Sequence, residues 1–208
     1  MQIGSSLGQS APTADSVRVI RSTQPQNPKN TTMKKPISNA VMMSMLKKFT
    51  LSEREAKGYE GRKWMCSPFS IGLQTCATDA HAVIALPLAV GFEDRAKTFT
   101  GIYPLPHTDH TYFTTAELSQ KVEDFPKLEK WEILTKQIRI GKSIFSILLI
   151  KKLLFVAKKM KAKKITVTRQ TEPNRDTVFN VAGVEVLLMP IVAENASVLQ
   201  EIDPQPTP

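Results

Sequence analysis

Residues 143–191 read SIFSILLIKKLLFVAKKMKAKKITVTRQTEPNRDTVFNVAGVEVLLMPI, and this stretch decides the fold. Apolar residues recur every three or four positions over Ile147–Lys161, which predicts an amphipathic helix. Downstream, β-branched and apolar residues alternate with polar ones in short runs, which predicts strands. The expected strands are Lys164–Thr168, Thr177–Val181 and Val184–Met189. The last two flank Ala182-Gly183, where glycine suits the tight turn of a hairpin.

The positive charge of the chain is concentrated around this helix. Residues 133–171 contain eleven Lys or Arg and no Asp or Glu, whereas the whole chain of 208 residues has a net charge of +9. On a helical wheel one stripe is basic and the opposite stripe is apolar. The basic stripe consists of Lys151, Lys152, Lys158 and Lys159. Leu148 and Phe155 fall within it, so either they contact a neighbouring element or this face is not fully solvated.

An acid-free basic stretch of this length predicts a negatively charged partner, and nucleic acid is the commonest one. Lysine is a mobile point charge suited to phosphates, whereas base edges are read mainly by Arg, Asn and Gln. If duplex DNA binds here, we expect non-specific binding that weakens steeply with salt. Two alternatives remain open. One is an ordinary helix with a solvated lysine face, and the other is a helix on a membrane surface, which the lack of Trp anchors disfavours.

The segment upstream predicts a second helix and a pair of strands. The expected elements are a helix over Ala40–Phe49, a loop or short helix over Leu51–Gly61, and two strands within Ile71–Leu88. Ser38 or Asn39 can cap the helix. A polar interruption inside the apolar run predicts a tight turn at Asp79-Ala80, with one continuous buried strand as the alternative.

Composition divides the chain into a domain and two tails. Residues 1–37 and 193–208 are polar and proline-rich, so they bury too little surface to offset the entropy of ordering, and we expect flexible tails. The domain is expected over 38–192, with an irregular excursion at about 91–137. Near its end, Gln137–Ile140 is expected to be a strand and Ser143–Phe145 the entry to the helix.

Several function classes find no support. No apolar run approaches the ~18 residues of a membrane span, and no phosphate-binding glycine loop or dinucleotide fingerprint occurs. Cys66 and Cys76 are expected to be free thiols in a reducing compartment, which implies a cytoplasmic location. His107 and His110 flank Asp109 at a spacing that could chelate a metal, but a surface loop is the better interpretation. We therefore expect no enzyme activity, no metal and no cofactor.

The stretch from Phe145 to Ile191 and the turn sequence ATDAH at Ala77–His81 are two motifs that resemble the sliding-clamp family, the beta subunit of bacterial DNA polymerase III. Phe145 and Leu148–Met160 match the helix of the family's last lobe, and Lys164–Thr168 matches the strand after it. Leu187–Ile191 matches the strand that ends in a Met-Pro signature. Ala77–His81, with the sequence ATDAH, resembles the family motif Ala-Thr-Asp-Gly-His, which also lies between apolar strands.

The resemblance implies an α+β fold, a single DNA-clamp-like lobe with two helices packed on an antiparallel sheet. Ala80 replaces the glycine of the family motif, and Ala82 replaces the arginine that usually follows its histidine. Clamp rings contain six lobes, and this chain has room for one. A ring would therefore need a homo-oligomer of six copies, or partner chains.

The resemblance also implies a function. Clamp helices line the DNA hole, which makes Arg139, Lys142, Lys151, Lys152, Lys158 and Lys159 candidate DNA-binding residues. Clamp motifs of this kind form a groove for short peptides of replication and repair proteins, which makes Thr78, His81, Val83, Leu187, Met189, Pro190 and Ile191 candidate groove residues. The expected function is a sliding-clamp-like DNA-binding and partner-tethering protein, a processivity or recruitment factor, encoded by a phage or mobile element. The alternative is a clamp-fold interaction or structural module that has lost DNA encirclement.

Overall fold

The computed structural model describes residues 37–87, 91–95, 109–125, 136–191 and 198–207, and these belong to one compact unit. The predicted N-terminal tail lies outside them apart from Ile37. The helices are α1 (Asn39–Phe49), α2 (Glu53–Ala56), the 3-10 helix η1 (Glu60–Cys66), α3 (Thr115–Glu123) and α4 (Ile147–Lys159). The strands are β1 (Phe69–Ile71), β2 (Gln74–Thr78), β3 (Ala82–Leu86), β4 (Thr111–Thr114), β5 (Lys136–Ile140), β6 (Ser143–Ser146), β7 (Lys164–Arg169), β8 (Thr177–Val181), β9 (Val184–Leu188), β10 (Val198–Ile202) and β11 (Gln205–Pro206).

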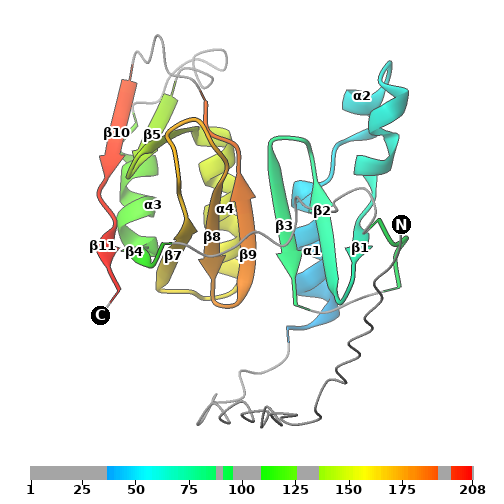
Figure 1. The fold of residues 1–208 in the computed structure, drawn as a ribbon, viewed down its shortest axis with the longest axis horizontal. Coiled ribbons are helices and arrows are strands. Elements are labelled where there is room, and N and C mark those ends of the chain that lie inside the picture. The colour runs from blue at the N-terminus through cyan, green and yellow to red at the C-terminus, as the bar shows by residue number, and fades with distance from the viewer. Residues whose placement is uncertain (1–36, 88–90, 96–108, 126–135, 192–197, 208) are drawn as a thin grey trace, which may run out of the picture. The chain divides into compact units, whose positions relative to one another are not determined.

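An eight-stranded sheet organises the unit. Its strand order is β1-β2-β3-β9-β8-β7-β4-β11, and every neighbouring pair is antiparallel. A smaller sheet has the order β10-β5-β6, with β10 parallel to β5. In the view of Figure 1, α1 lies behind β2 and β3, and α4 lies behind β8 and β9. The predicted α+β class, with helices packed on an antiparallel sheet, is confirmed.

The core lies between the helices and the sheet. Strand residues facing the helices are fully buried, among them Ile84, Val186 and Phe179. From the helices, Met45 and Leu153 enter the same cluster. Alternate strand residues face the other side, as the two-residue period of a strand requires.

Residues at their ends determine where the two long helices begin and end. Ser38 caps α1 by accepting a hydrogen bond from the Val41 amide, and Ser146 caps α4 by accepting one from Leu148. Both predicted helices are confirmed. The second ends at Lys159 rather than Lys161, because the chain turns into the left-handed region at Lys161, with φ of 51°.

The predicted hairpins are also confirmed. β8 and β9 join through Ala182-Gly183, both with positive φ, and the Gly183 amide donates to Asn180 Oδ1 at 3.0 Å. β2 and β3 join at the predicted turn, where Ala80 has φ of 76°. Alanine occupies a conformation that glycine adopts without strain, so this turn depends on other contacts.

Two parts of the chain are more ordered than the sequence indicates. The excursion at 91–137 contains β4 and α3 among its described residues. The prediction of a flexible C-terminal tail at 193–208 is wrong for 198–207, because β10 pairs with β5 over five residues and β11 pairs with β4. Burial of Ile202, only 2% exposed, helps to offset the entropy of ordering this segment.

Candidate functional site

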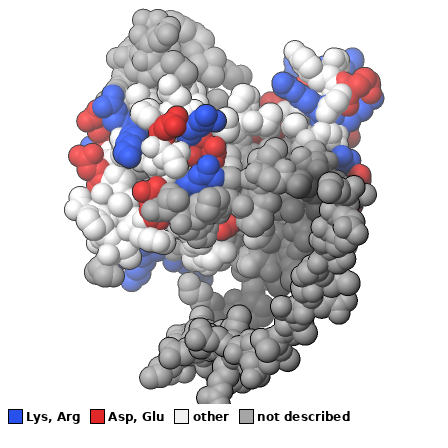
Figure 2. Space-filling model, in the orientation of Figure 1, with Lys and Arg blue, Asp and Glu red and all other residues white. Residues whose placement is uncertain are grey.

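The helix pair α1–α4 carries one sign of charge. Neither helix contains an Asp or Glu, and their exposed lysines are Lys47, Lys48, Lys151, Lys158 and Lys159. Lys151 and Lys158 lie seven residues apart, about 10 Å along the axis. Figure 2 views the opposite face of the sheet, where Lys and Arg are interspersed with Asp and Glu. The helices α1 and α4, which contain no acidic residue, lie behind the sheet in this view.

Lys47 and Lys48 were not among the residues singled out from the sequence. They occupy the last turn of α1, where positive charge also stabilises the helix by its interaction with the macrodipole. The signal that could have found them is simple: the predicted helix over 40–49 has two lysines and no acid. α1 packs against α4, so the two lysine-bearing helices adjoin each other.

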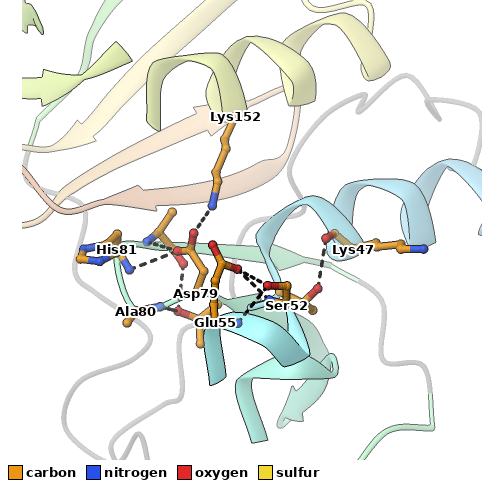
Figure 3. Close-up of polar contacts among 10 residues, drawn as sticks. Lys47, Ser52, Glu55, Asp79, Ala80, His81 and Lys152 are labelled. Carbon is orange, nitrogen blue, oxygen red and sulfur yellow. Dashed lines mark hydrogen bonds and ion pairs between the residues drawn. The ribbon is translucent and has the colours of Figure 1, made fainter. Parts of the chain in front are cut away.

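Lys152 was predicted to contact phosphates, but its side chain is partly buried and paired. Its side chain is only 14% exposed, and its ammonium group forms an ion pair with Asp79 Oδ2 (Figure 3). The same ammonium lies 5.5 Å from the centroid of the Phe49 ring at the end of α1. Lys152 thus ties α4 to α1 and to the β2–β3 turn, and we remove it from the residues proposed to contact phosphates.

The β2–β3 turn is held by side chains of the ATDAH motif. Asp79 Oδ1 accepts hydrogen bonds from the amides of His81 at 3.1 Å and Ala82 at 2.9 Å. Thr78 Oγ1 accepts one from the Ala80 amide at 3.1 Å and donates to the Ala82 carbonyl at 2.9 Å. These bonds fix the turn despite the positive φ of Ala80. In this chain Asp79 therefore stabilises the turn and anchors Lys152.

The two apolar residues of the basic stripe behave differently. Phe155 packs against the core, and the Lys159 ammonium lies 5.4 Å from its ring centroid. Leu148 is 45% exposed beside the lysines. Of the two explanations considered for these residues, contact with a neighbouring element accounts for Phe155, whereas the exposure of Leu148 fits neither.

Arg139 and Lys142 lie apart from the helix face. Arg139 is on β5, where its Nε is 3.5 Å from Glu201 of β10, and Lys142 is in the β5–β6 turn. The Lys142 side chain is exposed, and its amide donates to Gln170 Oε1 at 3.0 Å. The predicted DNA-binding residues are thus divided between α4 and a hairpin of the smaller sheet.

The predicted groove residues are brought together at the centre of the large sheet. Val83 pairs with Thr78 on one side and with Leu187 on the other, and the Met189 amide donates to the His81 carbonyl at 2.9 Å. Val83, Leu187, Pro190 and Ile191 are half-buried, and Met189 is 41% exposed, whereas Thr78 is buried. Ile84, Val186 and Leu188 enter the core, so the alternate residues Val83, Leu187 and Met189 form an apolar strip on the sheet face turned away from the helices.

Metal binding, thiol chemistry and membrane crossing were also considered for the described part of the chain. No group of three His, Cys, Asp or Glu residues there could hold a metal ion, although His107 lies outside it. Cys66 and Cys76 are both free thiols. Burial, and next the negative charge of Glu185, raises the pKa of the Cys76 thiol to about 12. Within the same ranges, no helix has the length and apolarity needed to cross a membrane.

Comparison with known proteins gives a likeness of fold. No protein-family model matches the chain, and no curated protein matches it. Among solved structures it is similar to the beta subunit of DNA polymerase III from Thermotoga maritima, with a TM-score of 0.46, 13% identity, and coverage of 76% of this chain and 63% of that one. For the beta subunit from Pseudomonas aeruginosa the TM-score is 0.35, the identity 8%, and the coverage 57% and 42%. The chain therefore spans less than two thirds of either subunit. Both subunits belong to the family that the sequence motifs resemble.

Proposed function

We propose that this protein binds duplex DNA without sequence preference through the α1–α4 face. The observation that best supports this proposal is the presence of five exposed lysines on two adjoining helices that have no acidic residue. Ammonium groups on flexible stems match phosphates whose positions vary, and they read no base edge. Release of condensed counterions then supplies most of the affinity, which depends steeply on salt.

A second activity, tethering of a partner, is proposed for the apolar strip around Val83, Leu187 and Met189. The strip is half-buried, and strips of this kind accept apolar side chains of a short peptide. It lies on the sheet face, whereas the lysines lie on the helix face. One chain could therefore hold DNA and a replication or repair protein at the same time, as a cytoplasmic processivity or recruitment factor would, whether of phage or other mobile-element origin.

A second candidate function is an interaction module that does not encircle DNA. The observation that favours it is Leu148, a large apolar side chain that is 45% exposed in the middle of the lysines. An apolar side chain adds little to phosphate contact, but it suits an acidic protein surface. The two candidate functions also differ in whether they require a ring, because a single lobe surrounds DNA only with other copies or partner chains.

The test compares two variants that lose the same charge. One is Lys151→Gln, Lys158→Gln and Lys159→Gln, and the control replaces exposed cations elsewhere, with Lys57→Gln, Lys63→Gln and Arg175→Gln. Binding to two duplexes of unrelated sequence is measured at one salt concentration. The proposal predicts a large loss for the first variant on both duplexes and a small loss for the control. Equal losses would mean that only net charge matters, and no loss in either would favour the interaction module.

A further inference from the structure

The two edges of the large sheet are β1 and β11. An unpaired edge strand presents a row of N–H and C=O groups that invites pairing with another chain, so soluble proteins usually block such edges. Both edges here are formed by strands of only two or three residues. How each is closed bears on whether copies of this chain join through their sheets.

At the β4 side, the edge is closed by residues 205–207. Gln205 pairs with Tyr112 and Pro206 with Thr111 in antiparallel register. Thr207 donates twice to the His110 carbonyl, through its amide at 2.8 Å and its hydroxyl at 2.5 Å. Beyond Tyr112 the outer side of β4 runs into α3, because Thr114 is the N-cap of that helix. This short cap therefore occupies most of the accessible edge.

The sequence of the cap matches the period of a strand. In an antiparallel pair the amides of alternate residues point toward the partner. Thr207 donates to β4, so the Gln205 amide also points inward and position 206 points outward. Position 206 is a proline, which has no N–H to offer. The run Asp203-Pro-Gln-Pro-Thr-Pro continues the same alternation, with prolines at 204, 206 and 208.

The cap is anchored by the strand before it. β10 pairs with β5 over five residues, and the Ile202 carbonyl accepts the Gly141 amide at 3.0 Å. Ile202 is 2% exposed, and Glu201 lies 3.5 Å from the Nε of Arg139. The segment therefore links the small sheet to the edge of the large one and is fixed on both sides.

The opposite edge is covered as well. Ser70 of β1 donates through its amide to the Glu93 carbonyl at 2.9 Å and accepts at its own carbonyl from the Arg95 amide at 2.9 Å. A short bridge between Ser70 and Asp94 accompanies these bonds. The outer side of β1 is thus occupied by residues 93–95.

We propose that Gln205–Thr207, with its alternating prolines, is an edge cap that prevents the large sheet from pairing with a second copy of this chain at β4. Without the cap, the β4 edge is free to pair with the same edge of another copy about a two-fold axis, since antiparallel pairing is self-complementary. A ring of copies would then have to use surfaces other than continuation of this edge. The inference goes beyond the proposed function and does not depend on DNA binding.

The test uses the full chain without DNA, followed by sedimentation over a wide range of protein concentration. One variant, Pro204→Thr with Pro206→Thr, restores outward N–H groups, and the matched control changes two exposed prolines elsewhere, Pro87→Thr with Pro173→Thr. A third variant ends the chain after Ile202 and uncovers β4. We expect wild type and control to keep one mass at all concentrations, and the other two to grow to about twice that mass or more.

Circular dichroism and thermal unfolding of each variant check that it is folded. If the truncated chain fails to fold, the double proline variant alone decides the matter, because it keeps the cap in place. Masses of the proline variant that match those of wild type at every concentration would overturn the proposal. Growth of the control variant to the same extent would overturn it too.

Discussion

Replacing Asp79 by Asn is expected to destabilise the protein through Lys152. The asparagine side chain retains an oxygen that can accept the amides of His81 and Ala82, so the turn keeps its hydrogen bonds. The ammonium of Lys152 loses its ion-pair partner. It stays in a site where its side chain is 14% exposed, beside the Phe49 ring. The substitution thus isolates the ion pair from the turn.

The magnitude lies between those of two limiting cases. Breaking a fully buried ion pair by removing one partner costs about 3–5 kcal/mol, because the remaining charge is desolvated. Exposed pairs contribute about 0–1 kcal/mol. Asp79 and Lys152 are 17% and 14% exposed, so partial solvation reduces the cost. We expect the Asp79→Asn variant to lose about 2 kcal/mol of unfolding free energy, which corresponds to a fall in Tm of roughly 4–8 °C for a domain of this size.

The assay is a double-mutant cycle in urea or thermal unfolding. Lys152→Met removes the ammonium but keeps much of the side-chain volume, and the double variant should be less destabilised than the sum of the two single changes by about 1–2 kcal/mol. Lys151→Met is the matched control, since Lys151 is exposed, and it should change stability by no more than about 0.5 kcal/mol. A coupling energy near zero would refute the view that this pair fastens α4 to the turn.

Two further predictions concern backbone geometry and thiol chemistry. Gly141→Ala should lower the free energy of unfolding in urea more than Gly72→Ala does. The two glycines have nearly the same φ, 55° and 57°, but a Cβ at 141 would lie 2.5 Å from Gln170 Oε1, whereas one at 72 meets nothing within 4 Å. Equal losses of unfolding free energy would contradict the close approach at 141. At neutral pH a thiol reagent should label Cys66 in the native protein and leave Cys76 unlabelled until denaturant is added, because burial holds the Cys76 pKa at about 12. Mass spectrometry follows the labelling of each cysteine over time. Similar labelling rates for the two thiols in the native protein would contradict the prediction.

Sequence patterns predicted those helices and strands that depend on residues close to one another in the chain. The helix over 147–159 and the β8–β9 hairpin follow from periodicity and from a turn containing Gly183, all within a few residues of one another. Helix α3 gave a weaker signal, because Leu118 is its one fully buried residue. Thr114 followed by Glu117 was nevertheless a capping signature, and the Glu117 amide does donate to Thr114 Oγ1 at 3.0 Å.

Elements that depend on distant partners could not be predicted from one sequence. β10 is stabilised by pairing with Lys136–Ile140, more than sixty positions earlier in the numbering. The prolines around Gln205 indicated a tail, although proline is compatible with an edge strand when its nitrogen faces outward. At the candidate site, the wheel placed Lys151, Lys158 and Lys159 on the polar side of the helix, and all three are exposed. It could not show that Lys152 is held by Asp79, which lies 73 residues upstream.

The salt dependence of duplex DNA binding tests the central claim most directly. If all five exposed lysines of α1 and α4 contact phosphates, the plot of log K against log salt concentration should have a slope of about −4 to −5. Replacing Lys151, Lys158 and Lys159 by Gln should make that slope shallower by about 2–3, whereas Lys152→Met should leave it unchanged. Failure to bind duplex DNA, or equal slopes for wild type and the three-lysine variant, would contradict the account.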